Sequence, residues 1–258
     1  MDAVLFDVDG VLTVSWQAVE GAAEALAAVR AAGLPVRLLT NTTSRPQHEV
    51  VEALRSAGFD VADDEVLTTP LATAAHLRAH HPDARCLLLS EGELGEDLAG
   101  IRLVEHDPHV VVLGGAGPAF SYERLNRAFR AIVEGAPVVA MHRNTTWKTD
   151  QGLQLDTGAY LVGLEHSAEV SVTVVGKPAA AMFEAALAAV GVAADHALMV
   201  GDDLDSDVQG AQQAGLRGVL VRTGKWRSDP RPDQPQPDEI LDSVADLPTL
   251  LGLDRRRA

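Results

Sequence analysis

Two hydrophobic spacings alternate along the first part of the chain, one typical of buried strands and one typical of helices. The continuous apolar run at 4–6 predicts a short buried strand. Between 17 and 32, apolar residues recur at steps of three and four, which predicts a helix with Gly33 at its end. A second apolar run at 35–40 and a helical pattern ending at Gly58 follow. Strand, helix, strand and helix with short connections predict a parallel α/β sheet.

The middle of the chain shows further strand and helix patterns, which we interpret as a second α/β unit at 70–173. Apolar runs of strand length and amphipathic stretches of helical length again alternate there. The expected helices are 71–79, 121–134 and a piece at 160–164, and the expected strands are 85–89, 110–113 and 138–141.

From Val174 onward the first pattern resumes. The expected elements are a helix ending at Gly191, a strand at 197–200, a helix reaching Ala214 and a strand at 219–221. Four prolines within 224–239 predict an extended loop. The chain therefore reads as one sheet domain, 1–69 plus 174–258, interrupted by the inserted unit at 70–173.

Charge and composition narrow the range of partners and compartments. At a formal net charge of -16, the surface repels polyanions, which argues against nucleic acids and acidic membranes as partners. Cys86 is the sole cysteine, so the chain has no internal disulfide and a reducing compartment is favoured. No apolar run reaches the ~18 residues that a bilayer-spanning helix needs, and the cytoplasm is the expected location.

Polar side chains that packing does not require stand where the predicted strands end or helices begin. They are Asp7 and Asp9 before Gly10, then Thr40 and Asn41, Lys177, and Asp202, Asp203, Asp205 and Asp207. The carboxyl ends of parallel strands meet at one edge of a sheet, where open α/β sheets bind their ligands. Each segment has an ordinary alternative, such as a turn, a helix cap or a solvated lysine. Four such segments in this order favour one shared crevice.

These residue types indicate phosphoryl transfer assisted by a metal ion. A carboxylate such as Asp7 can attack phosphorus and form an aspartyl-phosphate, and Asp9 can protonate the leaving oxygen and then activate water. Mg²⁺ prefers carboxylates, water and substrate phosphate as ligands, and it offsets the repulsion between an anionic nucleophile and an anionic substrate. The Thr40 hydroxyl, the amide at Asn41 and the Lys177 ammonium can cradle the phosphoryl oxygens.

The four segments resemble the signature motifs of the haloacid dehalogenase superfamily of phosphohydrolases. In motif order, they are Asp7-Val8-Asp9-Gly10, Leu39-Thr40-Asn41, Lys177, and Gly201-Asp202-Asp203 with Asp207. The unit at 70–173 resembles the large α/β cap of the subgroup that includes nitrophenylphosphatase-like enzymes. The resemblance implies a Rossmann-like parallel-sheet core, formed by 1–69 and 174–258, with an inserted α/β cap domain.

The resemblance also implies a role for each matched residue. Asp7 would be the nucleophile, Asp9 the general acid and base, and Lys177 the partner of Asp7 and of the phosphate. Mg²⁺ would be held by the Asp7 carboxylate, the Asp9 backbone carbonyl and the Asp202 carboxylate, with Asp207 holding a metal-bound water. Some similar members of the family carry serine at the position of Asp9, so their substrates do not transfer directly to this chain.

One segment of the inserted unit, 142–148, follows a predicted strand and interrupts the apolar pattern. In similar caps the corresponding loop faces the catalytic crevice, so we expect Arg143, Trp147 and Lys148 to help select the substrate. A solvated hairpin tip is the alternative. The histidines His76, His80 and His81 have a helical spacing that resembles metal sites, and we interpret them as an exposed helix face.

The leading hypothesis is a Mg²⁺-dependent phosphatase for small phosphorylated metabolites, with phosphate monoesters first and pyrophosphate or phosphoamides as further substrates. Phosphoryl transfer between two positions of a sugar is an alternative that the large cap disfavours. Carbon–halogen hydrolysis is disfavoured because it needs neither Asp9 nor the metal site. A non-catalytic, regulatory protein that binds a phospholigand would have no need of the intact set Asp7, Asp9, Lys177 and Asp202. The oligomeric state stays open, and a homodimer is compatible with the sequence.

Overall fold

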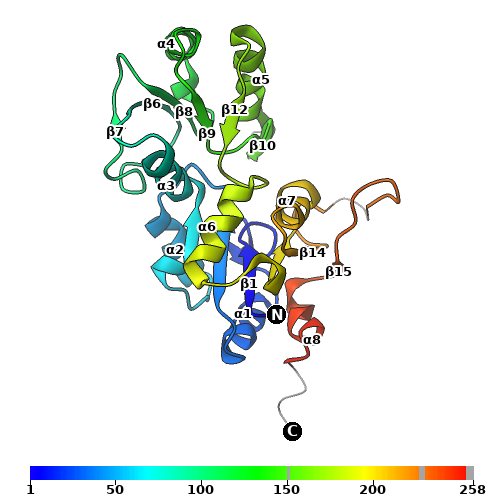
Figure 1. The fold of residues 1–258 in the computed structure, drawn as a ribbon. Helices are drawn as coiled ribbons and strands as arrows, with labels where there is room; N and C mark the ends of the chain where they lie inside the picture. The colour runs from blue at the N-terminus through cyan, green and yellow to red at the C-terminus, as the bar shows by residue number, and fades with distance from the viewer. Residues whose placement is uncertain (150–151, 227–229, 254–258) are drawn as a thin grey trace. The chain divides into compact units, whose positions relative to one another are not determined.

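The chain folds into two compact α/β units in the computed structural model, which describes residues 1–149, 152–226 and 230–253. The first unit consists of Met1–Thr40, Gln47–Leu67 and Lys177–Ala258, and the second of Asn41–Pro46 and Thr68–Gly176. Each unit is built on a sheet with parallel strand pairs (Figure 1), which confirms the predicted α/β class.

The first unit contains a six-stranded sheet in the order β15-β14-β13-β1-β4-β5. Its strands are β1 (Ala3–Asp7), β4 (Val36–Thr40), β5 (Val66–Thr68), β13 (Ala197–Gly201), β14 (Arg217–Val221) and β15 (Glu239–Leu241). The central strand β1 pairs in parallel with β4 on one side and β13 on the other. All five of its residues are buried, which explains why this strand reads as a continuous apolar run rather than an alternating one.

Helices and short turns complete the first unit around an aliphatic core. The helices are α1 (Ala22–Ala31), α2 (Gln47–Ser56), α6 (Ala180–Val190), α7 (Gly210–Gln213) and α8 (Leu247–Leu250), with a π-helical turn at Leu204–Gln209 before α7. The core combines strand residues such as Val4, Phe6 and Leu38 with helix residues such as Leu26 and Leu54.

The helix predicted at 17–32 begins later than expected, at Ala22. Gly21 adopts a left-handed conformation with φ 77°, so the backbone cannot continue as a right-handed helix before it. The preceding residues instead form a small antiparallel hairpin of β2 (Thr13–Val14) and β3 (Gln17–Ala18). The prediction was therefore wrong at its start, because the apolar spacing continued through a turn.

The second unit contains a five-stranded sheet in the order β12-β9-β8-β6-β7. Its elements are β6 (Arg85–Leu89), β7 (Arg102–Leu103), β8 (Val110–Leu113), β9 (Val138–Ala140), β12 (Val172–Val174), α3 (Thr69–His80), α4 (Tyr122–Val133) and α5 (Thr157–Ala168). Figure 1 shows α4 and α5 side by side, and their inner faces pack with β8 and β9 into the second core. A hairpin of β10 (Thr146–Thr149) and β11 (Gly152–Leu155) lies between β9 and α5 in sequence.

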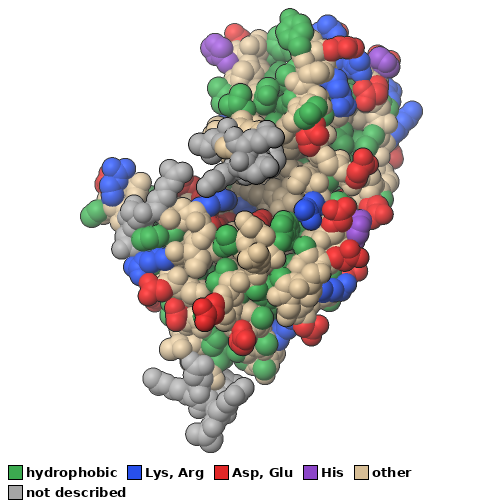
Figure 2. Space-filling view, turned by 180° about the vertical axis from the view of Figure 1, so that it is seen from behind, with side chains coloured by type: hydrophobic (Ala, Val, Ile, Leu, Met, Phe, Trp, Pro, Cys, Tyr) green, Lys and Arg blue, Asp and Glu red, His purple; other side chains and the backbone are tan. Residues whose placement is uncertain are grey.

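The surface carries charges of both signs. Figure 2 shows acidic and basic side chains interspersed over the face that it presents, with hydrophobic side chains between them. The longest helices in the described ranges, α3, α4 and α5, have 12 residues each. No described helix is therefore close to the roughly 20 apolar residues that cross a bilayer.

Candidate active site

Three neighbouring strands of the first unit deliver polar side chains to one edge of its sheet. Asp7 is the last residue of β1, Thr40 is the last residue of β4, and Asp202 directly follows β13. The strands are parallel and in close register, with Asp7 opposite Leu39 and Phe6 opposite Val200. Their carboxyl ends therefore meet, as the sequence predicted for this edge.

Four charged side chains are buried together at this edge, and we call them the acidic cluster: Asp7, Asp202, Asp207 and Lys177. Their residues are between 1% and 5% exposed. Each aspartate offers a carboxylate oxygen, and these three oxygens lie within 4.8 Å of one another. The Lys177 Nζ pairs with the Asp7 carboxylate, lies 2.8 Å from Asp207 Oδ1 and donates to the Leu39 carbonyl oxygen at 3.3 Å.

Burial and mutual repulsion disturb the titration of the acidic cluster. Burial raises the pKa of Asp7 well above its usual range, although the ammonium of Lys177 opposes this. Burial, reinforced by the charge of Asp207, raises the pKa of Asp202 to about 6. Burial alone would lower the pKa of Lys177, but the carboxylates of Asp207 and Asp7 outweigh it and hold that pKa above its usual value.

The acidic cluster fits a divalent cation held by oxygen ligands. Three carboxylates face one paired ammonium, so the fully ionised set carries excess negative charge that burial makes costly. The buried Asp202 Oδ1 has no hydrogen-bond partner among the described residues. Within the described ranges, no other group of three potential ligands lies this close together. An all-oxygen set of this kind suits Mg²⁺.

The neighbouring acids that follow β13 have different structural roles. Asp203 caps the turn at Leu204–Gln209, and its Oδ1 accepts from the backbone N–H groups of Asp205 and Ser206, both at 3.1 Å. The Asp207 Oδ2 accepts from the Asp203 N–H at 3.2 Å, which orients its carboxylate within the acidic cluster. The capping alternative considered for this segment therefore applies to Asp203, while Asp202 and Asp207 belong to the acidic cluster.

A loop at 222–225, for which the sequence predicted no role in the site, contacts the Asp202 carboxylate. The Lys225 N–H donates to Asp202 Oδ2 at 2.5 Å, and the Thr223 hydroxyl donates to the Gly10 carbonyl oxygen. Gly224 has φ 64°, and a Cβ at this position would collide with the Asp202 carboxylate. In sequence, the stretch 221–225 also resembles similar members of the family, but no role at the site was predicted for it, and the expected proline-rich loop begins at Gly224. The position of 222–225 directly after β14 was the available signal, because β14 ends at the same sheet edge.

Asp9 lies in the turn that leaves β1 and is half-buried. Backbone hydrogen bonds from Gly10 N to the Thr13 oxygen at 2.6 Å and from Thr13 N to the Val8 oxygen at 3.0 Å hold this turn. Gly10 has φ 92°, and a Cβ there would also collide with the Asp202 carboxylate. Both glycines are thus required because the backbone approaches Asp202 closely from two directions.

The remaining predicted site residues belong to the second unit. The Asn41 Oδ1 accepts from the Thr69 hydroxyl at 3.3 Å. The Arg143 guanidinium binds both carboxylate oxygens of Glu165, with the longer contact at 3.0 Å, so a substrate would have to compete with this pair. The side chains of Trp147 and Lys148 lie outside the described part of the structure. The role of these residues in substrate selection stays a prediction.

Family models and curated relatives match most of the chain. The model "Haloacid dehalogenase-like hydrolase" matches residues 4–103, and the model "HAD-hyrolase-like" matches 174–247. Haloacid dehalogenase-like hydrolase domain-containing protein 2 of Homo sapiens is 40% identical over 238 residues, which cover 92% of this chain and 90% of that protein. Phospholysine phosphohistidine inorganic pyrophosphate phosphatase of Mus musculus is 36% identical over 259 residues, 96% of this chain and 93% of that protein.

Solved structures of phosphatases share the fold over nearly the whole chain. A p-nitrophenyl phosphatase from Archaeoglobus fulgidus superposes with a TM-score of 0.89 at 26% identity, covering 96% of this chain and 98% of that chain. A glycerol phosphate phosphatase from Mycobacterium tuberculosis, in complex with magnesium, superposes with a TM-score of 0.84 at 30% identity, covering 95% and 76%. Fold and acidic cluster are those of a phosphohydrolase. The chain belongs to the haloacid dehalogenase-like hydrolase family, which confirms the resemblance found in its motifs.

Proposed function

We propose that this chain is a Mg²⁺-dependent phosphatase of small phosphorylated metabolites, in which Asp7 accepts the phosphoryl group. The observation that carries the proposal is the acidic cluster, with Asp7 at the end of the central strand and Lys177 paired to it. A buried cluster of three carboxylates and one ammonium has no role in packing. In this proposal the first unit is the catalytic core and the second unit, which includes all of the predicted 70–173, is the cap.

The reaction proceeds in two displacements at phosphorus. A carboxylate oxygen of Asp7 attacks phosphorus, the bond from phosphorus to the leaving oxygen breaks, and the Asp9 carboxyl protonates that oxygen. The Asp9 carboxylate then takes a proton from water, whose oxygen attacks the aspartyl-phosphate. The bond between phosphorus and Asp7 breaks, which releases inorganic phosphate and restores both aspartates.

The other residues of the acidic cluster support these steps electrostatically. The Lys177 ammonium keeps Asp7 oriented and offsets charge on the phosphoryl oxygens, while the Thr40 hydroxyl is placed at the end of the adjacent strand. The Asp7 and Asp202 carboxylates and the Asp9 carbonyl would hold Mg²⁺, with Asp207 supporting them. When bound, the ion neutralises the excess charge of the acidic cluster and of the substrate phosphate.

The substrate class follows from the chemistry of the site and from the names of the relatives. Two displacements at phosphorus accept any phosphoryl donor whose leaving atom can be protonated, which includes esters, anhydrides and phosphoamides. Similar proteins are named for p-nitrophenyl phosphate, glycerol phosphate, and phospholysine, phosphohistidine and pyrophosphate. We place phosphate monoesters first, because a carboxyl at Asp9 can protonate the poor leaving group of an alkyl ester.

Hydrolysis of p-nitrophenyl phosphate tests this function directly. We expect turnover with Mg²⁺, loss of turnover with EDTA and recovery with excess Mg²⁺, because the metal-free acidic cluster repels an anionic substrate. Asp202→Asn should be inactive under all three conditions. Asp205→Asn should respond to Mg²⁺ and EDTA as the wild type does, because Asp205 is exposed and lies outside the acidic cluster. Turnover that persists in EDTA, or in Asp202→Asn, would show that the metal role is wrong. A panel of phosphorylated metabolites then identifies the substrate.

A further inference from the structure

Three histidines gather at the C-terminal end of α3 in the second unit, and the phosphatase reaction uses none of them. His76 and His80 are four residues apart on the helix, so their side chains lie on the same face. Their ring centroids are 4.4 Å apart, and the ring of His81, at the C-cap position, lies 6.1 Å from that of His76. The three imidazoles therefore form one cluster.

The spacing of the rings is close to that of imidazoles sharing one metal ion. With Zn–N distances of about 2.0–2.1 Å, two imidazole centroids on a tetrahedral ion are roughly 5 Å apart. The observed separations of 4.4 and 6.1 Å lie on either side of this value. The nitrogens of the three rings do not yet converge on one point, since the three aspartates are the only group of three or more potential ligands in the described ranges whose ligand atoms all lie within 4.8 Å of one another. Binding thus requires ring rotation.

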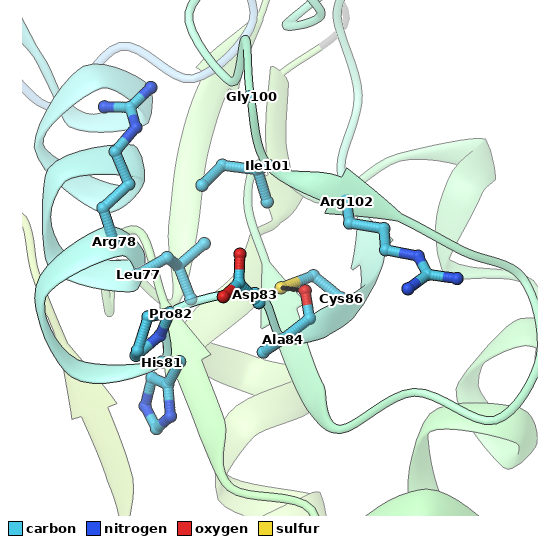
Figure 3. Close-up of a pocket in the computed structure, with 10 residues that line it drawn as sticks. All are labelled: Leu77, Arg78, His81, Pro82, Asp83, Ala84, Cys86, Gly100, Ile101 and Arg102. Carbon is cyan, nitrogen blue, oxygen red and sulfur yellow. Dashed lines mark hydrogen bonds between the residues drawn. The ribbon is translucent and has the colours of Figure 1, made fainter.

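The surroundings permit this rotation. His80 is exposed, and His76 and His81 are half-buried. His81 borders a cavity of about 300 Å³ that is also lined by Leu77, Ile101 and Cys86. Figure 3 shows the His81 imidazole pointing away from Leu77 and Ile101, below the end of the helix.

The electrostatics of this end of α3 also favour a cation bound by neutral imidazole. Burial, followed by the charges of His80 and His81, lowers the pKa of His76, so its ring is neutral and able to bind metal at neutral pH. The C-terminal end of a helix carries partial negative charge from its unpaired carbonyl groups. The nearest helix cation, Arg78, donates to the Ala99 carbonyl oxygen at 2.6 Å, and Figure 3 shows it pointing away from His81.

We propose that His76, His80 and His81 form a second metal site, selective for transition-metal dications of the Zn²⁺, Ni²⁺ and Cu²⁺ class. Imidazole nitrogen binds these ions well, whereas Mg²⁺ requires oxygen ligands. The site is therefore chemically distinct from the acidic cluster, and both sites can be loaded at once with different ions.

Zinc titration of the full-length protein in a large excess of Mg²⁺ tests the proposal. The excess Mg²⁺ occupies the acidic cluster, and calorimetry should then report about one further equivalent of Zn²⁺ bound per chain. The double variant His76→Ala/His80→Ala should bind at least about tenfold more weakly, since removing two of three ligands removes the chelate. A matched double variant, His106→Ala/His166→Ala, removes two histidines elsewhere in the same unit and should bind as the wild type does.

Equal Zn²⁺ affinity in the wild type and in His76→Ala/His80→Ala would overturn the proposal, and so would absence of Zn²⁺ binding by the wild type under these conditions. Thermal unfolding checks that both variants are folded. If the double variant is not folded, the single variant His80→Ala replaces it, because His80 is exposed and its loss leaves the core untouched. The readout is binding alone, so its result is independent of phosphatase activity.

Discussion

Asp7→Asn is expected to abolish phosphatase activity and to leave the metal-free protein at least as stable as the wild type. The amide has the same shape as the carboxylate but cannot attack phosphorus, so kcat should fall by at least about 10⁴-fold, as for other nucleophile replacements. The substitution also removes one of three buried carboxylates, whose burial and repulsion raise the pKa of Asp7. The Asp7→Asn variant should therefore lose activity without losing stability, which excludes unfolding as the reason for its inactivity.

The measurement combines p-nitrophenyl phosphate turnover in Mg²⁺ with thermal unfolding in EDTA. The melting temperature of Asp7→Asn should equal or exceed that of the wild type, and Asp205→Asn serves as the control for an exposed carboxylate of the same type. Activity of Asp7→Asn within about a hundredfold of the wild type would contradict the assigned nucleophile. A melting temperature of Asp7→Asn below that of the wild type in EDTA would contradict the excess negative charge described for the acidic cluster.

Lys177→Met is expected to destabilise the metal-free protein by about 3–5 kcal/mol at neutral pH, because removing one member of a buried charged group leaves the others unpaired. Lys177 is 3% exposed and pairs with both Asp7 and Asp207. Methionine preserves most of the aliphatic volume but supplies no charge. The variant then holds three buried carboxylates whose remaining basic neighbour, Lys225, is 61% exposed at its side chain and offsets their charge only in part.

The destabilisation should grow as pH rises. A carboxyl whose pKa is higher in the folded than in the unfolded state, as for Asp202 at about 6 against 3.8, keeps its proton in the fold, so stability falls as pH rises through that window. Without Lys177, the folded-state pKa values of Asp7 and Asp202 rise further and the loss extends to higher pH. Urea unfolding in EDTA should therefore show a larger deficit at pH 8 than at pH 5, and Mg²⁺ should reduce it.

Arg217→Met provides the control for the loss of a basic side chain. Arg217 is 48% exposed at its side chain and lies 3.9 Å from Glu239, so its removal should change the free energy of unfolding by less than about 1 kcal/mol. A deficit in Lys177→Met that matches this control, or one that does not change between pH 5 and pH 8, would refute the described charge balance.

Much of the site could be predicted from sequence because the carboxyl ends of parallel strands lie at the same edge of a sheet. Asp7, Thr40 and Asp202 are far apart in sequence, yet β1, β4 and β13 are neighbours in the sheet. Each of these three polar residues directly follows an apolar run and interrupts its pattern. The apolar runs thus predicted both the strands and the placement of the polar residues.

Other features depend on backbone geometry that residue spacing does not encode. Asp202 and Asp203 are adjacent acids of the same type, and only the structure separates the buried carboxylate from the one that caps a turn. Gly224 lies close to Asp202, although the two residues are far apart in sequence. The prolines that follow Gly224 predicted only an extended loop and gave no sign of this contact. The left-handed conformation of Gly21 likewise ended an apolar helical spacing that had been extended to residue 17.

The stereochemical course at phosphorus tests the central claim most directly. A phosphorothioate monoester made chiral by oxygen isotopes is hydrolysed in isotopically labelled water with Mg²⁺, and the configuration of the released thiophosphate is determined. Each in-line displacement inverts phosphorus, so transfer to Asp7 followed by transfer to water predicts net retention. Net inversion would mean that water attacks the substrate directly, and it would contradict the assignment of Asp7 as the nucleophile.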